Sequence, residues 1–380
     1  MKVEFYRHAL GEEEIASVVE TLHSVFLTAG PKTRAFEAAF AEYLGIRRVV
    51  GFSSCTTALW LTLRALGIGP GDEVITTPMT FIATANAILE AGGTPVFVDV
   101  EASTGNLDAE RVAAAITPRT KAILPVHLYG QMCDMRRLRV IADQHNLAII
   151  EDAAHCVEGE RDGVRPGQLG DAACFSFYAT KNLCSGEGGA VATQRDDLAE
   201  QLLLCRSHGM DKGAAERHHG RYQHWDMVCL GQKANMFDIQ AALLLPQIPK
   251  ISRHWQRRSE IVASYESALT GVPGVTLHRM PLGSRHARHL FTILVPPSAR
   301  DPFLAQLQAF GIGCTVNYRA IHLLSYYRQR FNLPRGSFPV AEEIGDCTVS
   351  LPLWVGLQEH EIRHVIDGVR SSLKQVTRKA

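Results

Sequence analysis

Short apolar segments alternate with amphipathic segments between residues 47 and 194, and this alternation constrains the fold more than any other feature. The expected strands are residues 47–52, 72–77, 94–100, 121–127 and 147–151. The expected helices between and after them are residues 55–66, 79–90, 108–116 and 135–145. Strands joined by helices are typical of βαβ units, so the sequence predicts an α/β fold around a mostly parallel sheet.

The pattern changes after about residue 245, where prolines punctuate the chain. The elements expected beyond this point are a helix at 251–269, strands at 289–295 and 314–318, and a helix at 302–310. We therefore predict a large α/β domain with an N-terminal arm over residues 1–245 and a smaller α+β domain over residues 246–380. Residues 209–231 are polar, rich in His and without periodicity, so we expect a long functional loop there.

Composition excludes several classes of protein. Lys plus Arg and Asp plus Glu both number 39, so no overall basic field is available for nucleic acid or an acidic membrane. We expect no membrane span and no signal peptide, because long apolar runs are lacking. The nine scattered cysteines fit a reducing cytoplasm, and the 16 histidines lack metal-binding spacing, so no metal site is expected.

Three features follow expected strands. Residues 53–59 place several hydroxyl side chains where a helix begins, which favours a bound phosphate, although ordinary N-capping explains the same pattern. Glu151 and Asp152 end an apolar run, where a buried carboxylate needs a cation or a hydrogen-bond donor. A metal-ligand pair or a salt bridge to an arginine is the alternative for this acidic pair.

The third feature is Lys181, which follows the aromatic run 175–178 and precedes the glycine-rich residues 185–189. We expect the aromatic run to be a buried strand. A low dielectric disfavours an ammonium, so a buried lysine can become a neutral amine that forms a Schiff base with a carbonyl. The alternative is a lysine that extends to solvent from the strand end.

A phosphate-binding helix start, a buried carboxylate and a neutral lysine together match pyridoxal 5′-phosphate (PLP). Ser176 would add a hydroxyl to the phosphate. Phe81 is the best candidate for an aromatic side chain stacked on the cofactor ring, although core packing is the usual role of a single phenylalanine.

With these residues in place, the chain resembles the DegT/DnrJ/StrS family of sugar aminotransferases, which have the type I (aspartate aminotransferase-like) PLP-dependent transferase fold. Within the family, the sequence motifs are most similar to those of UDP-4-keto-sugar C4 transaminases of the aminoarabinose and pseudaminic acid routes. The resemblance covers nearly the whole chain. The matching segments are residues 26–31, 69–76, 94–100, 120–123, 151–155, 175–181, 187–189 and 317–319, together with His322.

The resemblance implies a role for each matching residue. Lys181 would form the Schiff base and move protons, Asp152 would pair with the pyridine nitrogen, and Phe81 would stack on the ring. The remaining implied cofactor contacts are Thr56, Thr57 and Ser176 at the phosphate, His155 near the ring oxygen, and Asn235, which the neighbouring subunit of a homodimer would supply. The implied substrate contacts are Thr28, Gly30, Glu187, Arg319 and His322.

The implied reaction moves an amino group from glutamate to a nucleotide-linked 4-keto sugar, with UDP the expected nucleotide. The chain departs from the motifs common in the family at three places. These are Tyr178, where many members have His, Cys55, and residues 232–234. The last departure blurs the assignment of Asn235.

Three other functions are weighed against this one. A PLP-dependent sugar dehydratase is disfavoured because related deoxygenating enzymes replace the lysine with histidine. A non-catalytic regulator that binds PLP or a sugar nucleotide would not need Lys181. A nicotinamide-binding protein is disfavoured because no G-x-G-x-x-G follows the first expected strand.

Overall fold

The structure is a computed structural model that describes residues 1–212 and 224–377. Seven strands form its main sheet: β1 (Arg48–Phe52), β2 (Glu73–Thr76), β3 (Thr94–Phe97), β4 (Thr120–Leu124), β5 (Ala148–Asp152), β7 (Ala172–Ser176) and β8 (Gly189–Thr193). Their order is β1-β8-β7-β5-β4-β2-β3. Only β8 runs against the others within this sheet, so the predicted mostly parallel α/β sheet is confirmed.

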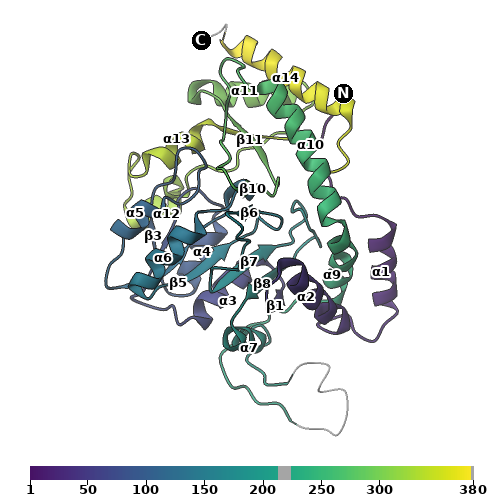
Figure 1. Ribbon diagram of the computed structural model, residues 1–380, viewed down its shortest axis with the longest axis vertical. Helices are drawn as coiled ribbons and strands as arrows, with labels where there is room; N and C mark the ends of the chain where they lie inside the picture. Colours follow the sequence, from purple (N-terminus) through teal and green to yellow (C-terminus); the bar gives the residue numbers. More distant parts are fainter. Residues whose placement is uncertain (213–223, 378–380) are drawn as a thin grey trace.

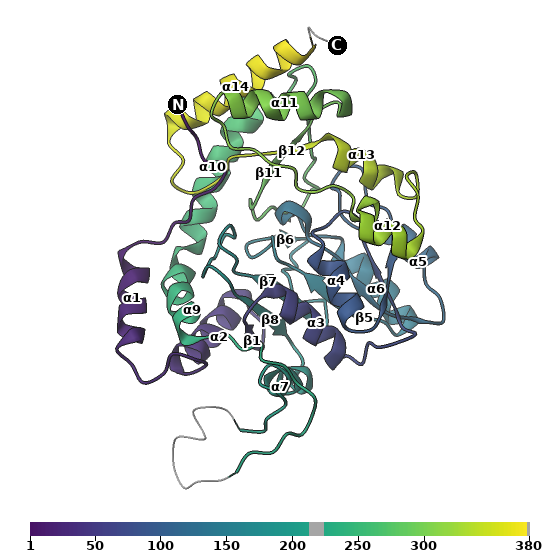
Figure 2. The same cartoon turned by 180° about the vertical axis from the view of Figure 1, so that it is seen from behind.

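Helices cover both faces of this sheet (Figures 1 and 2). One face carries α3 (Cys55–Ala65), α4 (Ala83–Glu90) and α7 (Asp196–Cys205), and the other carries α2 (Pro31–Leu44), α5 (Ala109–Ala114) and α6 (Met135–His145). Successive strand residues point to opposite faces, so Ile149 joins one apolar core and Ile150 the other. Burial on both sides explains why the strands read as continuous apolar runs.

The C-terminal part has its own core around a three-stranded antiparallel sheet. Its strands are β9 (Thr276–Leu277), β11 (Phe291–Leu294) and β12 (Thr348–Leu351), and its main helices are α10 (Ile251–Leu269), α11 (Pro297–Ala309) and α14 (Glu359–Thr377). The other elements are α1 (Glu12–Leu22), α9 (Asp238–Leu244), α12 (Ser325–Phe331), α13 (Pro339–Cys347), β6 (Glu160–Arg161), β10 (Ser284–Arg285), and the 3-10 helices η1 (Leu128–Gly130), η2 (Leu245–Lys250) and η3 (Ile321–Leu323).

The N-terminal arm connects the two parts. Val3 is buried in the C-terminal core, where its backbone pairs with Gly311 and Gly313. The chain then runs down to α1, which packs against α9 at the side of the large sheet (Figure 1). The first residues therefore belong to the C-terminal core, and the boundary at residue 245 stays a prediction.

Several predicted elements have different limits. The segment 314–318 is not a strand, because its backbone pairing with β12 is limited to Thr315 and Ser350. Beyond Thr315 the chain leaves the small sheet and reaches the main pocket. The helix expected at 79–90 begins only at Ala83, and the strand expected over the aromatic run ends at Ser176.

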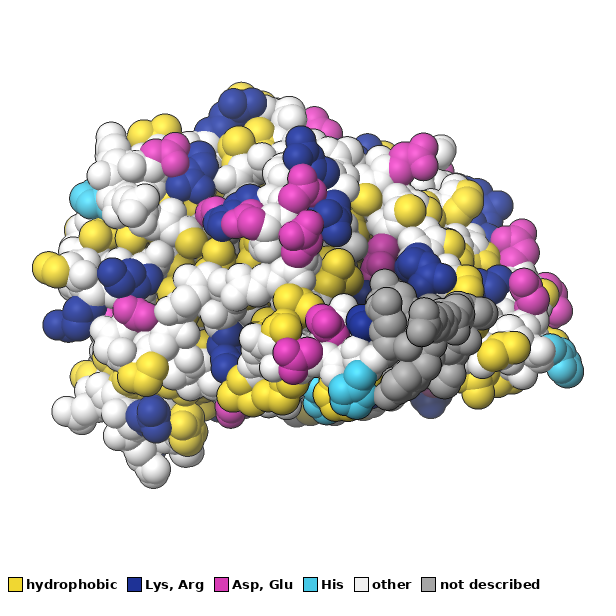
Figure 3. Space-filling view, turned by 90° about the horizontal axis from the view of Figure 1, so that it is seen from below, with side chains coloured by type: hydrophobic (Ala, Val, Ile, Leu, Met, Phe, Trp, Pro, Cys, Tyr) yellow, Lys and Arg dark blue, Asp and Glu magenta, His cyan; other side chains and the backbone are white. Residues whose placement is uncertain are grey.

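The surface carries charges of both signs. On the face shown in Figure 3, Lys and Arg side chains are interspersed with Asp and Glu side chains. A mixed surface of this kind gives no long-range field of one sign on that face. Across residues 1–212 and 224–377, the helices all fall short of the length and apolar character that crossing a membrane requires.

Candidate active site

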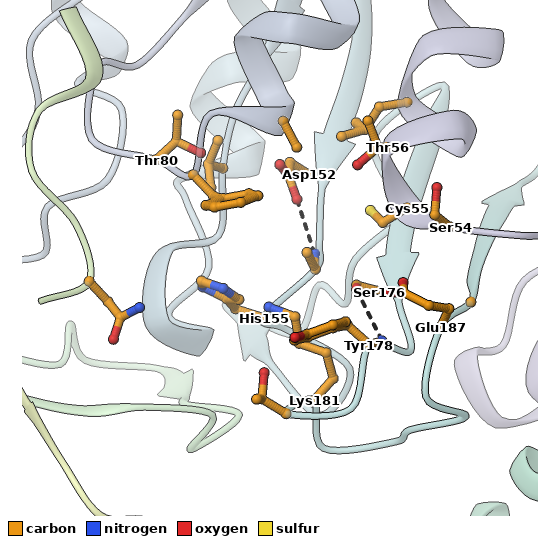
Figure 4. Close-up of a pocket in the computed structure, with 18 of the residues that line it drawn as sticks. Ser54, Cys55, Thr56, Thr80, Asp152, His155, Ser176, Tyr178, Lys181 and Glu187 are labelled. Carbon is orange, nitrogen blue, oxygen red and sulfur yellow. Dashed lines mark hydrogen bonds between the residues drawn. The ribbon is translucent and has the colours of Figure 1, made fainter. Parts of the chain in front are cut away.

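A pocket of about 550 Å³ lies at the carboxyl ends of β5 and β7 (Figure 4). Parallel strands open their ligand sites at this edge, where the chain leaves the sheet into loops. The predicted residues that line the pocket are Thr56, Phe81, Asp152, His155, Ser176, Lys181 and Glu187. The fold therefore brings together residues separated by more than a hundred positions in the chain.

Lys181 projects into this pocket from the turn between β7 and β8. The turn is held by backbone bonds, including Lys181 N–H to the Tyr178 carbonyl at 2.8 Å. Burial disfavours the ammonium and lowers the pKa of Lys181 to about 8, although Asp152 and Cys55 act in the opposite direction. A fraction of this amine is therefore neutral near pH 7.5, as nucleophilic attack requires.

Asp152 lies at the end of β5, across the pocket from Lys181 (Figure 4). Its Oδ2 accepts a 2.7 Å hydrogen bond from the Thr84 hydroxyl, and its Oδ1 accepts one from the Ala154 N–H at 3.1 Å. Burial raises the pKa of Asp152, while these donors and the charge of Lys181 favour the carboxylate. A carboxylate held in this way can balance a positive charge in the pocket.

The neighbouring Glu151 has a different role, because successive strand residues face opposite sides of the sheet. Its side chain is fully buried and binds His127 at 2.7 Å. It also accepts hydrogen bonds from the N–H groups of Gly167 and Gly170. Only Asp152 of the acidic pair reaches the pocket.

His155 is held as a neutral imidazole with a defined tautomer. Its Nδ1 accepts a hydrogen bond from the Tyr129 backbone N–H at 3.2 Å, so the ring proton resides on Nε2. Nε2 faces the Tyr318 hydroxyl at 3.2 Å. Burial, followed by the charge of Lys181, lowers the pKa of His155 well below its usual value. His155 is therefore an uncharged hydrogen-bond donor at the pocket wall, and its Nε2–H donates to the Tyr318 hydroxyl.

The start of α3 forms another wall of the pocket. Ser54 is the N-cap, and its Oγ accepts a hydrogen bond from the Thr57 N–H at 3.1 Å. The Thr57 hydroxyl turns back to the Ser54 carbonyl at 2.9 Å, so Thr57 contributes to the cap and does not line the pocket. Thr56 and Cys55 do line it, beside the backbone of the first helical turn.

Gly189 lets β8 approach this helix start closely. A Cβ at this position would lie 2.4 Å from the Cys55 nitrogen and from the Ser54 carbonyl carbon, closer than real Cβ contacts allow. Gly189, the last residue of the glycine-rich segment, is thus required by the close packing of β8 on α3.

Three predicted residues gather outside the pocket that Lys181 occupies. The Asn235 amide donates to the Thr28 hydroxyl at 3.3 Å, and the Gly30 N–H donates to Asp238 Oδ1 at 2.8 Å. Asp238 also binds the N–H groups of Lys32 and Thr33, and thereby caps the start of α2. Asp238 was not predicted from the sequence, because its partners are some 200 residues away.

The other predicted substrate contacts also lie outside the pocket. Arg319 is exposed, directly after the pocket residue Tyr318. His322 has no accessible surface, binds Glu342 Oε1 at 3.0 Å and packs edge-on against Phe338. The His322 side chain is therefore buried outside the main pocket, and its expected contact with the substrate stays a prediction.

Reasoning from the sequence missed several pocket residues. They are Thr80, Thr180, Asn317 and Tyr318, together with Thr84 behind Asp152. Thr80 and Thr84 bind each other at 2.7 Å, and their spacing of four residues at a helix start was the available signal. Residues 213–223 of the expected loop 209–231 lie outside the described residues.

The residues present fit pyridoxal phosphate. The N-terminus of α3 and the hydroxyls of Thr56 and Ser176 form an anion site beside Gly189. Lys181 supplies an amine for an aldehyde, and Asp152 supplies a carboxylate for a protonated ring nitrogen. The pocket volume of about 550 Å³ is in the range of cofactor sites.

The chain is similar to known aminotransferases over nearly its whole length. Residues 8–370 match the DegT/DnrJ/EryC1/StrS aminotransferase family. A Bacillus subtilis (strain 168) relative, the spore coat polysaccharide biosynthesis protein SpsC, is 41% identical over 371 residues, which is 96% of this chain and 95% of SpsC.

Two solved structures have the same fold. DesV of S. venezuelae, solved in complex with a ketimine intermediate, gives a TM-score of 0.88 at 38% identity over 94% of both chains. Helicobacter pylori PseC, an aminotransferase involved in the biosynthesis of pseudoaminic acid, gives a TM-score of 0.92 at 31% identity over 99% of this chain and 100% of PseC. The chain therefore belongs to the DegT/DnrJ/EryC1/StrS family and is a PLP-dependent sugar aminotransferase.

Proposed function

We propose that this enzyme transfers an amino group from glutamate to a 4-keto sugar linked to a nucleotide, with UDP as the nucleotide. The proposal rests on one observation, the convergence of Lys181, Asp152 and the N-terminus of α3 on a single pocket. The relative SpsC, a spore coat polysaccharide biosynthesis protein, supports a product destined for a surface polysaccharide or glycan.

When bound, pyridoxal phosphate supplies an electron sink that makes the C–H bond beside the transferred nitrogen acidic. The Lys181 amine, with a pKa of about 8, accepts that proton in its neutral form and returns it as an ammonium. Asp152 keeps a negative charge at the closed end of the pocket, stabilised by Thr84 and the Ala154 N–H. The first turn of α3, whose N–H groups face the pocket at its N-terminus, would hold the phosphate.

We propose that Glu187, at the exposed mouth of the pocket, contacts the sugar. Thr28, Gly30 and Asn235 lie away from their own chain's pocket, which supports their delivery to the pocket of a second subunit in a homodimer. The exposed apolar side chains Val25 (92% exposed) and Phe237 (43% exposed), which flank this cluster in sequence, support a covered surface there. Arg319 would bind the nucleotide or the donor carboxylate.

The experiment is a two-step assay on purified protein reconstituted with pyridoxal phosphate. Glutamate alone should convert the cofactor to its amine form and release 2-oxoglutarate, and Lys181→Ala should abolish this conversion. A panel of UDP-, dTDP- and GDP-linked 4-keto sugars should then identify the acceptor by release of an amino sugar. A deoxysugar product would instead indicate a dehydratase, and cofactor binding without conversion by any amino donor would indicate a binding protein.

A further inference from the structure

A hydrogen-bonded network lies directly behind Lys181, on the side away from the main pocket. Its centre is Asn182, the next residue in the chain. The Asn182 Nδ2 donates to Glu158 Oε2 at 2.8 Å and to the Ala287 carbonyl at 2.9 Å. Because both partners are acceptors, the amide orientation is fixed, and its Oδ1 faces the opposite way.

This orientation determines the tautomer of His289. The Asn182 Oδ1 lies 3.3 Å from His289 Nδ1, and a carbonyl oxygen can only accept, so Nδ1 carries the proton. The His289 ring in turn lies against His155, with ring centroids 4.5 Å apart. Asn182 therefore connects the lysine turn to both imidazoles beside the pocket.

The far side of the network is a buried ion pair. Arg258, on α10, binds Glu158 Oε1, and the side chains are only 3% and 1% exposed. Glu158 follows β5, while Ala287 and His289 precede β11, so the network joins both cores of the molecule. A second cavity of about 30 Å³, enough for one water, is lined by Lys181, Asn182, Arg258 and His289.

Lys181 thus stands between two environments of different character. On one side is the main pocket with Asp152, and on the other is a smaller cavity that lies between Asn182, His289 and the exposed N-terminal residues Arg7 and His8. We propose that Asn182 and His289 are positioning residues that hold the Lys181 side chain in the main pocket and limit the access of water to its amine from this smaller cavity. This inference rests on the proposed role of Lys181 as the reacting amine.

The proposal is tested on the cofactor-free protein by competitive acetylation of Lys181 across pH, read by peptide mass spectrometry. Asn182→Ala leaves Glu158 paired with Arg258, so the buried charge stays compensated. We expect the pKa of Lys181 to rise from about 8 toward the ordinary 10.5 as more water reaches the amine through the enlarged cavity. Each unit of that rise lowers the neutral fraction at pH 7, and the rate of pyridoxal phosphate capture, about tenfold.

Asp152 and Cys55 act on the charge of Lys181. The charge of Lys181 acts in turn on His155 and His289, and Arg258 and His286 also act on His289. None of these is altered by Asn182→Ala. Asn106→Ala is the matched control, because its amide also bridges two backbone groups, the Gln131 carbonyl and the Leu128 N–H, outside the pocket lining. It should destabilise the protein to a similar extent and leave the titration of Lys181 unchanged.

A second variant, His289→Phe, tests the same proposal if Asn182→Ala does not fold. His289→Phe keeps a ring against His155 and removes the Nδ1 proton, and we expect a smaller shift of the Lys181 pKa in the same direction. If Lys181 titrates as in the wild type in both variants, or shifts equally in Asn106→Ala, the network is only structural. Because acetylation needs no turnover, this result is separate from failure of the aminotransferase assay.

Discussion

The Lys181 amine carries a burial cost that depends on pH. Its folded-state pKa of about 8 lies below the ordinary 10.5, so below pH 8 the folded protein must hold a charge that burial disfavours. Between pH 8 and 10.5 the folded state loses this proton before the unfolded state does, and the cost disappears. Lys181→Met should therefore stabilise the cofactor-free protein at pH 7, with a gain that shrinks as pH rises through this interval.

Urea unfolding of both proteins at pH 7 and pH 9.5 measures this difference. Lys121→Met, at an exposed position on β4, is the control and should give the same small change in free energy of unfolding at both pH values. A gain for Lys181→Met that is equal at the two pH values would show that the amine is not desolvated.

Thr84 supports Asp152 through a hydrogen bond to a charged group. Such bonds contribute about 1.5–3 kcal/mol, and Thr84→Val would leave one oxygen of Asp152 without this donor. We expect the pKa of Asp152 to rise further and the affinity for pyridoxal phosphate to fall about tenfold or more. Equilibrium titration of the cofactor-free protein gives the dissociation constant.

Thr62→Val is the matched control for this prediction. Thr62 is also fully buried on a helix that covers the same face of the sheet, but its hydroxyl contacts the weak partner Cys174 Sγ at 3.9 Å and no carboxylate of the described residues. The affinity for pyridoxal phosphate should be unchanged in Thr62→Val. Equal losses in both variants would contradict a specific role for Thr84.

At the scale of an element, α3 both supports the fold and presents its N-terminus to the pocket. Ser54→Ala removes the N-cap acceptor for the Thr57 N–H and should cost about 1 kcal/mol of stability. The loss of a polar lining residue at this helix start should also weaken the binding of pyridoxal phosphate more than the binding of pyridoxal, which lacks the phosphate. Calorimetric unfolding and titration with both ligands measure the two effects.

The N-cap of α5 provides the comparison. The Asp108 side chain accepts a hydrogen bond from the Glu110 N–H at 3.0 Å, on a helix that contributes nothing to the pocket lining. Asp108→Ala should cost a similar free energy of unfolding and leave both affinities unchanged. If Ser54→Ala lowered the affinities for pyridoxal and pyridoxal phosphate equally, α3 would not be the phosphate site.

At the scale of the whole molecule, the position of Asn235 predicts a site completed by a second copy of the chain. Lys181→Ala and Asn235→Ala should each be inactive or strongly impaired as pure proteins. Mixed after unfolding and refolding together, they should regain up to about a quarter of wild-type activity, because half of the random dimers contain one intact site. Activity no greater than the sum of the two pure variants would show that each site is built from one chain.

The sequence by itself determined the features that depend on local pattern. The alternation of strands and helices predicted the parallel sheet. It was readable because the spacing of apolar residues along the sequence reflects which face of each element is buried. Lys181, Asp152 and Ser176 were identifiable because each ends or follows a strand, and strand ends share one edge of the sheet.

Only the tertiary structure decided which of the remaining polar groups reach the pocket. Thr84 meets Asp152 across 68 residues, His322 is enclosed with Glu342, and Asn182 joins His289 across 107 residues. Such contacts depend on how whole elements pack against each other. The residues next to each position fix its backbone conformation. The partner of its side chain, however, comes from a distant element, and no short sequence pattern encodes where that element packs.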